Sequence, residues 1–279
     1  MDPIAYWNEQ AGPRWVALQE QLDRLLNPLG LRAMKEAAIR PGERVLDVGC
    51  GCGQSTLQLS EQVGADGLAV GVDVCQVMLA RARQRANWSA LNWSALFWQA
   101  DAASHPFHED PFDAVFSRFG LMFFSHPQQA FANLRRALYP GGRMVAVCWR
   151  DLEQNPLFEV ALRAAAPFLD LPDPTPHDLP GPFSLAPPGK AEQLLIQAGF
   201  AAVQCQPFED RISVGGLEES TDFLLQMGPV VPLLAEATPC TVAQVKARLR
   251  QLLQDYQTSA GVFLPTANWL LQGISQQAA

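Results

Sequence analysis

The chain alternates short apolar runs with segments whose apolar residues recur three or four positions apart. The segments have the spacing of helices, and the runs have the length of buried strands. Strands that alternate with helices in this way predict an α/β fold with a doubly wound parallel sheet. Seven strands are expected, at 44–48, 68–73, 95–100, 112–117, 143–149, 201–214 and 261–271.

The first forty residues are predicted to form a helical cap. Five apolar residues recur at near-helical spacing, namely Trp15, Leu18, Leu22, Leu25 and Leu26. The pair Asn27-Pro28 is expected to end that helix, and a second helix is expected at 31–39. One interpretation is that these helices pack on the core. The alternative is a lid in which Tyr6, Trp7 and Trp15 exclude water from a ligand.

The chain after residue 150 has a different composition. Prolines crowd the stretch 167–188, which predicts a long irregular loop. One helix is expected before this region, at 127–138, and three are expected within it, at 190–198, 217–227 and 241–256. Thr241 with Gln244 has the pattern of a capping box. We interpret 1–40 as cap, 41–150 as a cofactor-binding core, and 151–279 as helices forming an acceptor pocket plus the last two strands. The alternative for those helices is that they only cover the edge of the sheet.

Candidate chemistry begins where the first strand breaks into glycines. Gly49, Gly51 and Gly53 lead directly into a helix, which brings backbone N–H groups close to a ligand. The dinucleotide fingerprint needs its third glycine at position 54, where this chain has Gln54. Asp47 would also repel a pyrophosphate in a partly dry site. These residues predict a small cofactor that carries a cation.

The second strand ends in an acid, Asp73, twenty residues after the last of these glycines. A carboxylate at that position is placed to accept hydrogen bonds from ribose hydroxyls. An acid before the glycines and a second acid at this separation together form a more specific signal than either alone.

These stretches resemble class I S-adenosylmethionine-dependent methyltransferases. Val45-Leu46-Asp47-Val48-Gly49-Cys50-Gly51-Cys52-Gly53 is similar to their first motif, and Val70-Gly71-Val72-Asp73 is similar to the second. Gln99-Ala100-Asp101-Ala102 resembles the third motif, and 112–117 and 138–143 resemble the fourth strand and the turn before the fifth. Within that class the chain resembles the small-molecule methyltransferases of ubiquinone and menaquinone biosynthesis.

The resemblance implies a Rossmann-like methyltransferase fold that binds S-adenosyl-L-methionine and releases S-adenosyl-L-homocysteine. It also implies that the Asp101 carboxylate accepts from the adenine amino group and that the Ala102 N–H meets a ring nitrogen. The alternative for Asp101 is an acid in a turn that caps a helix. The expected cofactor-binding residues are Asp47, Gly49, Cys50, Gly51, Gly53, Asp73, Val74, Met78, Asp101, Ala102 and Ser117.

The stretch after the fourth strand bears on the methyl acceptor. It lacks the Asn-Pro-Pro-Tyr-like motif that in this class points to amino-group or nucleobase methylation, and it is apolar apart from Arg118. This favours O- or C-methylation of an apolar or aromatic small molecule. Arg118 and His126 are the candidate catalytic residues, although His126 precedes Pro127 and is alternatively a helix cap. A nicotinamide oxidoreductase and a non-catalytic cofactor-binding protein are the competing functions.

Composition narrows the partners. The chain has 28 acidic and 20 basic residues and a net charge of −8, without the clustered Lys and Arg that nucleic acid requires. We expect no membrane-spanning helix, a cytoplasmic protein and reduced cysteines, because no apolar run reaches about 18 residues and no secretory signal is seen. His105 and His108 flank Pro106 in a polar loop, so a metal site is not expected. Nothing indicates an oligomeric state, and the tandem pentapeptide at 87–91 and 92–96 is too short for a structural repeat.

Overall fold

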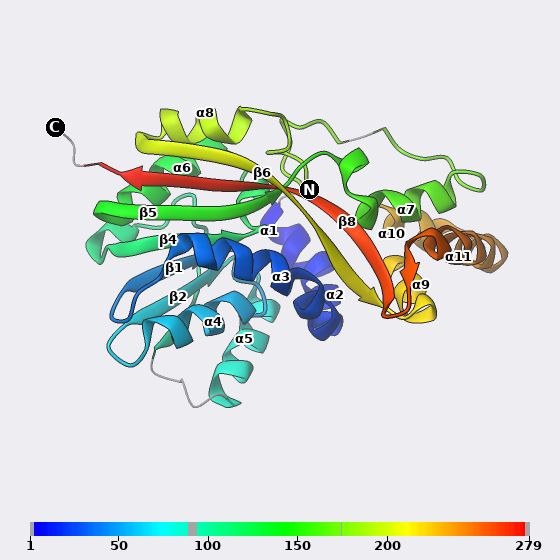
Figure 1. Ribbon diagram of the computed structural model, residues 1–279, viewed down its shortest axis with the longest axis horizontal. Coiled ribbons are helices and arrows are strands. Elements are labelled where there is room, and N and C mark those ends of the chain that lie inside the picture. The colour runs from blue at the N-terminus through cyan, green and yellow to red at the C-terminus, as the bar shows by residue number, and fades with distance from the viewer. Residues whose placement is uncertain (1–2, 89–93, 174, 277–279) are drawn as a thin grey trace. The chain divides into compact units, whose positions relative to one another are not determined.

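The computed structural model describes residues 3–88, 94–173 and 175–276 (Figure 1). Its sheet has the strand order β3-β2-β1-β4-β5-β8-β6, and the short strand β7 pairs with β8. The expected seven strands of the α/β sheet are confirmed, and β7 is an addition that the sequence did not predict. The strands are β1 (Arg44–Val48), β2 (Leu68–Asp73), β3 (Ala95–Gln99), β4 (Phe112–Arg118), β5 (Leu138–Trp149), β6 (Phe200–Gly215), β7 (Gln257–Thr258) and β8 (Gly261–Ser275).

The central strands are apolar because both of their faces are covered. Val45, Leu46 and Val48 of β1 are all buried, and β1 pairs in parallel with β2 on one side and with β4 on the other. Such burial on both faces is typical of parallel sheets. The helices with their bounds are α1 (Pro3–Tyr6), α2 (Gly12–Ala17), α3 (Gln19–Ala37), α4 (Gln54–Val63), α5 (Gln76–Trp88), α6 (Pro127–Arg136), α7 (Pro156–Ala165), α8 (Lys190–Gln197), α9 (Leu217–Leu224), α10 (Val230–Glu236) and α11 (Pro239–Leu253).

The strand order explains where the first helices lie. The chain steps from β1 through α4 to β2 and through α5 to β3, then starts again at β4 and steps through α6 to β5 on the other side of β1. Because parallel crossovers are right-handed, the two directions place α4 and α5 on one face and α6 on the other. The sheet reverses between β1 and β4, the position at which ligands bind in open α/β sheets.

One prediction about the cap was wrong. Helix α3 runs unbroken through Pro28, so the two helices expected on either side of Asn27-Pro28 are one. Proline removes a single helical hydrogen bond and normally ends or kinks a helix. Here Leu25, Leu26 and Leu29 are fully or almost fully buried, and tertiary packing of this face outweighs the local preference.

The start of β5 also differs from the prediction. Helix α6 ends at Arg136, so Leu138 is not its last apolar residue but the first residue of β5. The pairing of β4 with β5 then shifts, from Phe112 with Leu138 to Ala114 with Arg143. Five steps along β5 oppose two along β4, so the glycines at 141–142 lie in a bulge within the strand. The predicted turn is therefore an irregularity inside β5.

The chain divides into two compact units, and the boundaries differ in part from the three expected regions. Unit 1 comprises Met1–Trp149, His177–Pro207 and Trp269–Ala279, and unit 2 comprises Arg150–Pro176 and Phe208–Asn268. The three regions expected from the sequence were divided by role, and they stay a prediction.

Unit 2 is built mainly from helices, with α11 packed against α7 and α9. Helices α7 and α10 were not predicted. Thr238 caps α11, its side chain accepting from the Thr241 N–H at 3.1 Å, and Pro239 is the first helical residue. The capping box expected at Thr241 and Gln244 is therefore wrong by one turn.

Among the described residues, no helix is long and apolar enough to cross a membrane. Half of the tandem pentapeptide, residues 89–93, lies outside the described residues.

Candidate functional site

A cavity of about 420 Å³ opens at the carboxyl ends of β1, β2, β3 and β4. Its lining residues come from unit 1 and range from Ile4 to Gln129. This is the edge of the sheet to which the sequence motifs point, and it includes the reversal between β1 and β4. The volume lies in the range of small-molecule sites, roughly 300–1,000 Å³.

The glycine loop forms one wall of this cavity. Gly49 and Gly51 have φ angles of +71° and +54°, which residues with a Cβ rarely adopt. A Cβ at Gly49 would come within 2.8 Å of the Gly120 Cα, and a Cβ at Gly51 within 2.8 Å of the Met78 Cε. Glycine is thus required by close packing as well as by backbone conformation, and both residues line the cavity as predicted.

Asp73 lies at the end of β2 and holds the loop in place. Its Oδ2 accepts from the Gly51 N–H at 2.8 Å, and its Oδ1 accepts from the Cys75 N–H at 2.8 Å. Burial raises the pKa of this carboxyl, and the two N–H groups act in the opposite direction. Each carboxylate oxygen has a second lone pair, so the side chain keeps acceptor capacity toward the cavity it lines.

Asp101 and Ala102 follow β3 and also line the cavity. The Asp101 Oδ1 accepts from the Ala103 N–H at 2.9 Å, so this carboxylate closes a turn, and no helix begins there for it to cap. The loop is held from behind by Asn133 of α6, whose Nδ2 donates to the Ala102 carbonyl at 3.0 Å. The turn leaves the Asp101 Oδ2 with only a long contact of 3.5 Å to the Ser104 hydroxyl.

Three residues expected to bind the cofactor do not line the cavity: Asp47, Gly53 and Ser117. The Asp47 Oδ2 accepts from the hydroxyls of Ser55 at 2.7 Å and Thr56 at 2.6 Å, which fixes the first turn of α4. A Cβ at Gly53 would come within 2.8 Å of the Ala82 Cβ, so this glycine serves packing.

Ser117 likewise has a partner inside the protein. Its hydroxyl donates to the Val48 carbonyl at 2.8 Å and accepts from the Gly120 N–H at 3.3 Å. These bonds join the end of β4 to the end of β1. The sequence motifs placed the three residues next to the site but did not indicate that the Asp47 and Ser117 side chains bond within the protein or that Gly53 serves packing.

The remaining predicted cofactor-binding residues, Cys50, Val74 and Met78, line the cavity. Burial raises the pKa of the Cys50 thiol and raises that of Cys52 to about 12. Both thiols therefore stay protonated near neutral pH and act as small apolar groups. Among the described residues, no group of three or more His, Cys, Asp or Glu side chains is placed to hold a metal ion.

Aromatic residues, two of them from the N-terminal segment, form another part of the cavity wall. Trp7 packs edge-on against Trp15 at 5.8 Å and against Phe123 at 5.0 Å between ring centroids, and all three line the cavity. The Cys75 thiol donates to the Trp7 carbonyl at 3.3 Å and joins this segment to the loop after β2. The position of these rings supports the interpretation of the segment as a lid.

Two polar cavity residues on α3 were missed in the sequence. Gln19 accepts from Arg81 of α5, and the Asp23 Oδ2 pairs with the Arg85 Nη2 at 2.8 Å. The Arg85 Nη1 also donates to the Cys52 carbonyl at 2.7 Å, so this pair connects α3 to the glycine loop. Gln19 and Asp23 lie four residues apart beside the buried Leu22 and Leu26, and polar residues on an apolar helix face were the available signal.

The two candidate catalytic residues both line the cavity. Arg118 is half-buried at the end of β4, and its Nη1 donates to the Gln54 Oε1. His126 is exposed at the N-cap position of α6, as its place before Pro127 predicted. His126 is therefore the N-cap residue by position. Its side chain makes no hydrogen bond to the N–H groups of the helix.

The comparisons with known proteins agree with this geometry. Residues 45–142 match the family model described as a methyltransferase domain. The ubiquinone/menaquinone biosynthesis C-methyltransferase UbiE of Methylococcus capsulatus is 38% identical over 123 residues, which cover 44% of this chain and 50% of that protein. The 2-phytyl-1,4-naphtoquinone methyltransferase of Synechococcus elongatus is 36% identical over 136 residues, which cover 48% of this chain and 58% of that protein. The aligned part therefore spans about half of each relative.

The fold extends further than the aligned sequence. The YcgJ protein of Bacillus subtilis matches with a TM-score of 0.58 over 90% of this chain and 98% of its own, at 21% identity. The resemblance seen in the sequence motifs is confirmed by the family match and by these relatives. Residues 45–142 of this chain therefore match a methyltransferase domain, and the sheet has the Rossmann-like fold of such methyltransferases.

Proposed function

We propose that this protein transfers the methyl group of S-adenosylmethionine to a ring carbon of a small quinone-type aromatic molecule. The observation that carries the proposal is the cavity at the ends of β1–β4, to which Gly49, Asp73 and Asp101 contribute. The names of the relatives, a C-methyltransferase and a naphthoquinone methyltransferase, support the acceptor class.

The residues of the cavity fit this cofactor. Asp73 has acceptor capacity for ribose hydroxyls, and Asp101 has a carboxylate oxygen available for an exocyclic amino group. A Cβ at Gly49 or Gly51 would come too close to other protein atoms, so the loop faces the cavity with backbone alone. The acids of the cavity, Asp73 and Asp101, favour a ligand that carries a positive charge. The bound cofactor supplies a methyl group on a sulfonium, a good leaving group.

The part of the protein in this reaction is to align the reactants and to exclude water. Trp7, Trp15 and Phe123 cover the cavity with apolar surface, and Phe124 extends that surface toward His126. A flat aromatic acceptor is complementary to such a wall.

Ligand binding tests the cofactor class first. S-adenosylhomocysteine should raise the melting temperature, because a ligand that binds only the native state stabilises it. A rise with NAD(P) and none with S-adenosylhomocysteine would instead favour the oxidoreductase alternative.

A transfer assay tests the reaction. S-adenosylmethionine with a deuterated methyl group is incubated with reduced naphthoquinones and benzoquinones that carry alkyl chains of different length. NMR of the product should show the labelled methyl group on a ring carbon. A label on oxygen would retain the methyltransferase and contradict the carbon assignment, and binding without transfer to any member of the panel would favour the non-catalytic alternative.

A further inference from the structure

Arg118 is a cation in the cavity wall whose contacts inside the protein are neutral. The aliphatic part of its side chain lies against α3, where a Cβ at Gly30 would come within 2.9 Å of the Arg118 Cδ. Its Nη1 donates to the amide oxygen of Gln54. Within the described part of the chain, Arg118 makes no ion pair. One neutral acceptor uses one of the five N–H donors of a guanidinium.

The nearby acids do not contact this charge directly. Asp23 pairs with Arg85, and the Asp47 Oδ2 accepts from two hydroxyls on α4, while the Asp47 Oδ1 has no hydrogen-bond partner among the described residues. Both acids act on Arg118 only through space, while burial lowers the pKa of its guanidinium. A charge removed from water without a directly bound counter-ion is costly, which indicates that an anion completes this site.

The position of Arg118 in the sheet selects the anion. Gln54, its partner, directly follows the glycine loop, so the guanidinium lies at the glycine-loop end of the cavity. Asp101 follows β3, and the order β3-β2-β1-β4 separates the ends of these two strands by three strand spacings, roughly 14 Å. A ligand that spans this distance with its nucleoside at β3 places its other end near Arg118.

We propose that Arg118 binds the carboxylate of the methionyl part of the cofactor, and that it is a cofactor-binding residue rather than a catalytic one. The inference rests on the proposed function, since the carboxylate belongs to S-adenosylmethionine. A guanidinium and a carboxylate form two parallel charge-assisted hydrogen bonds, which fix orientation as well as affinity. The pair would hold the sulfonium at a defined distance from the loop after β4.

The test compares two ligands that differ in this group. S-adenosylhomocysteine carries the carboxylate, whereas methylthioadenosine keeps the nucleoside and sulfur but lacks the amino acid. Arg118→Gln should weaken S-adenosylhomocysteine about 10- to 100-fold in calorimetry and leave methylthioadenosine unchanged. The control is Arg163→Gln on α7, where the arginine is exposed and outside the cavity lining. An equal loss for both ligands, or no loss for either, would overturn the assignment.

A second variant supplies the anion from the protein. Gln54→Glu replaces the side-chain amide with a carboxylate of nearly the same shape and places that carboxylate against the Arg118 Nη1. It should weaken S-adenosylhomocysteine, spare methylthioadenosine, and keep or raise the melting temperature of the free protein. Unchanged affinity for S-adenosylhomocysteine would contradict the proposal even if Arg118→Gln failed to fold.

The remaining outcomes separate this inference from the proposed function. If the unaltered protein binds neither ligand, both are overturned. If it binds both ligands and Arg118→Gln raises only the KM for the methyl acceptor, the anion belongs to the acceptor, and the inference alone fails.

Discussion

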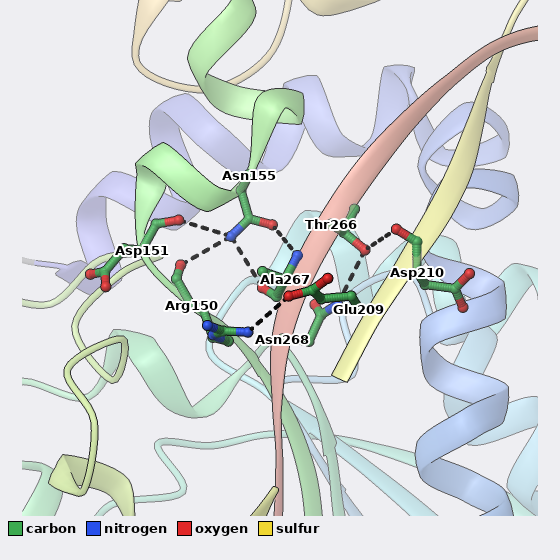
Figure 2. Close-up of polar contacts among 8 residues, drawn as sticks. All are labelled: Arg150, Asp151, Asn155, Glu209, Asp210, Thr266, Ala267 and Asn268. Atoms are coloured by element: carbon green, nitrogen blue, oxygen red, sulfur yellow. Dashed lines mark hydrogen bonds and ion pairs between the residues drawn. The ribbon is translucent and has the colours of Figure 1, made fainter. Parts of the chain in front are cut away.

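Asn155 in unit 2 and Arg118 in unit 1 are polar side chains held within the fold, and they differ in where their hydrogen bonds go. The Asn155 carboxamide is fully buried (Figure 2). Its Oδ1 accepts from the Ala267 N–H at 3.0 Å, and its Nδ2 donates to the carbonyls of Arg150, Asp151 and Ala267 at 3.0 to 3.1 Å. The Arg150 N–H also donates to the Ala267 carbonyl at 3.0 Å.

Asn155 therefore uses its hydrogen-bonding capacity within the protein, and its amide replaces a strand partner for Ala267. Arg118 uses one donor, and Asp73 and Asp101 keep acceptor capacity toward the cavity. A closed polar cluster contributes to stability and to one defined backbone arrangement. Polar groups that face a cavity with open capacity indicate a ligand. The predictions below test this distinction, beginning with the largest expected effect.

Replacing Asn155 should be the most destabilising change. Asn155→Ala leaves the Ala267 N–H and three carbonyls without this partner, so we expect a loss of about 3 kcal/mol in the free energy of unfolding. The tryptophans of the described residues, at positions 7, 15, 88, 98, 149 and 269, belong to unit 1, so a probe within unit 2 is needed. Amide hydrogen exchange of peptides covering 150–155 and 261–268 is the appropriate measurement.

Asn133→Ala is the matched control in unit 1, because that side chain also donates to backbone carbonyls. It should speed exchange around 102–105 and leave 261–268 unchanged. If Asn155→Ala left the exchange of 261–268 unaltered, the interpretation of Asn155 as a clamp would be wrong.

Asp73→Ala should affect binding more than stability. Its carboxylate is expected to accept from ribose, and such charge-assisted bonds contribute roughly 1.5–3 kcal/mol, or about a tenfold to hundredfold change in affinity. The change also removes the acceptor for the Gly51 and Cys75 N–H groups, so a smaller loss of stability is expected. Calorimetry with S-adenosylhomocysteine measures the first effect and urea unfolding the second. Asp66→Ala, at an exposed turn before β2, is the control, and an unchanged dissociation constant in Asp73→Ala would exclude the ribose role.

Much of the core could be predicted because its signals are local. Apolar runs of strand length ending in Asp73 or in glycines placed five strands and the edge where the cavity opens. The same reasoning could not place Asp47 or Ser117, because whether a strand-end side chain faces the cavity or an adjoining element depends on tertiary packing.

The errors have a similar origin. Pro28 remains inside α3 because the buried leucines around it stabilise the helix, and no local preference records that packing. The return of 177–207 and 269–279 to unit 1 depends on long-range strand pairing, which a one-dimensional pattern does not encode. Gln19 and Asp23 were visible as polar residues on an apolar face, but only the structure brings Arg85 to Asp23.

Asp47 should give a smaller, pH-dependent effect. Burial raises the pKa of its carboxyl above the ordinary value for Asp, and its Oδ1 is buried without a hydrogen-bond partner in the described part of the chain. The folded chain therefore holds this proton to higher pH than the unfolded chain. The contribution to stability is greatest below the unfolded pKa and is lost as the pH rises through the folded pKa.

Urea unfolding of the unaltered protein and of Asp47→Asn across a series of pH values, from acidic to neutral, measures this difference. The stability of the unaltered protein relative to Asp47→Asn should decline with rising pH. A difference that grew with pH would mean that the ionised carboxylate is the stabilising form, and the assigned direction would be reversed.

His126 should give the smallest effect, although it is the histidine that lines the cavity. Its imidazole is exposed at the N-cap of α6 and makes no capping hydrogen bond. We expect alignment rather than a histidine base to determine the rate, so His126→Ala should cost less than the ~100-fold typical of losing a general base. His126→Asn separates the two roles, because Asn is a preferred cap but not a base at neutral pH. Relative to His126→Ala, His126→Asn should have a higher melting temperature and the same or a higher turnover. A fall of more than about 100-fold in both variants, with cofactor affinity unchanged, would show that the imidazole accepts a proton in the reaction.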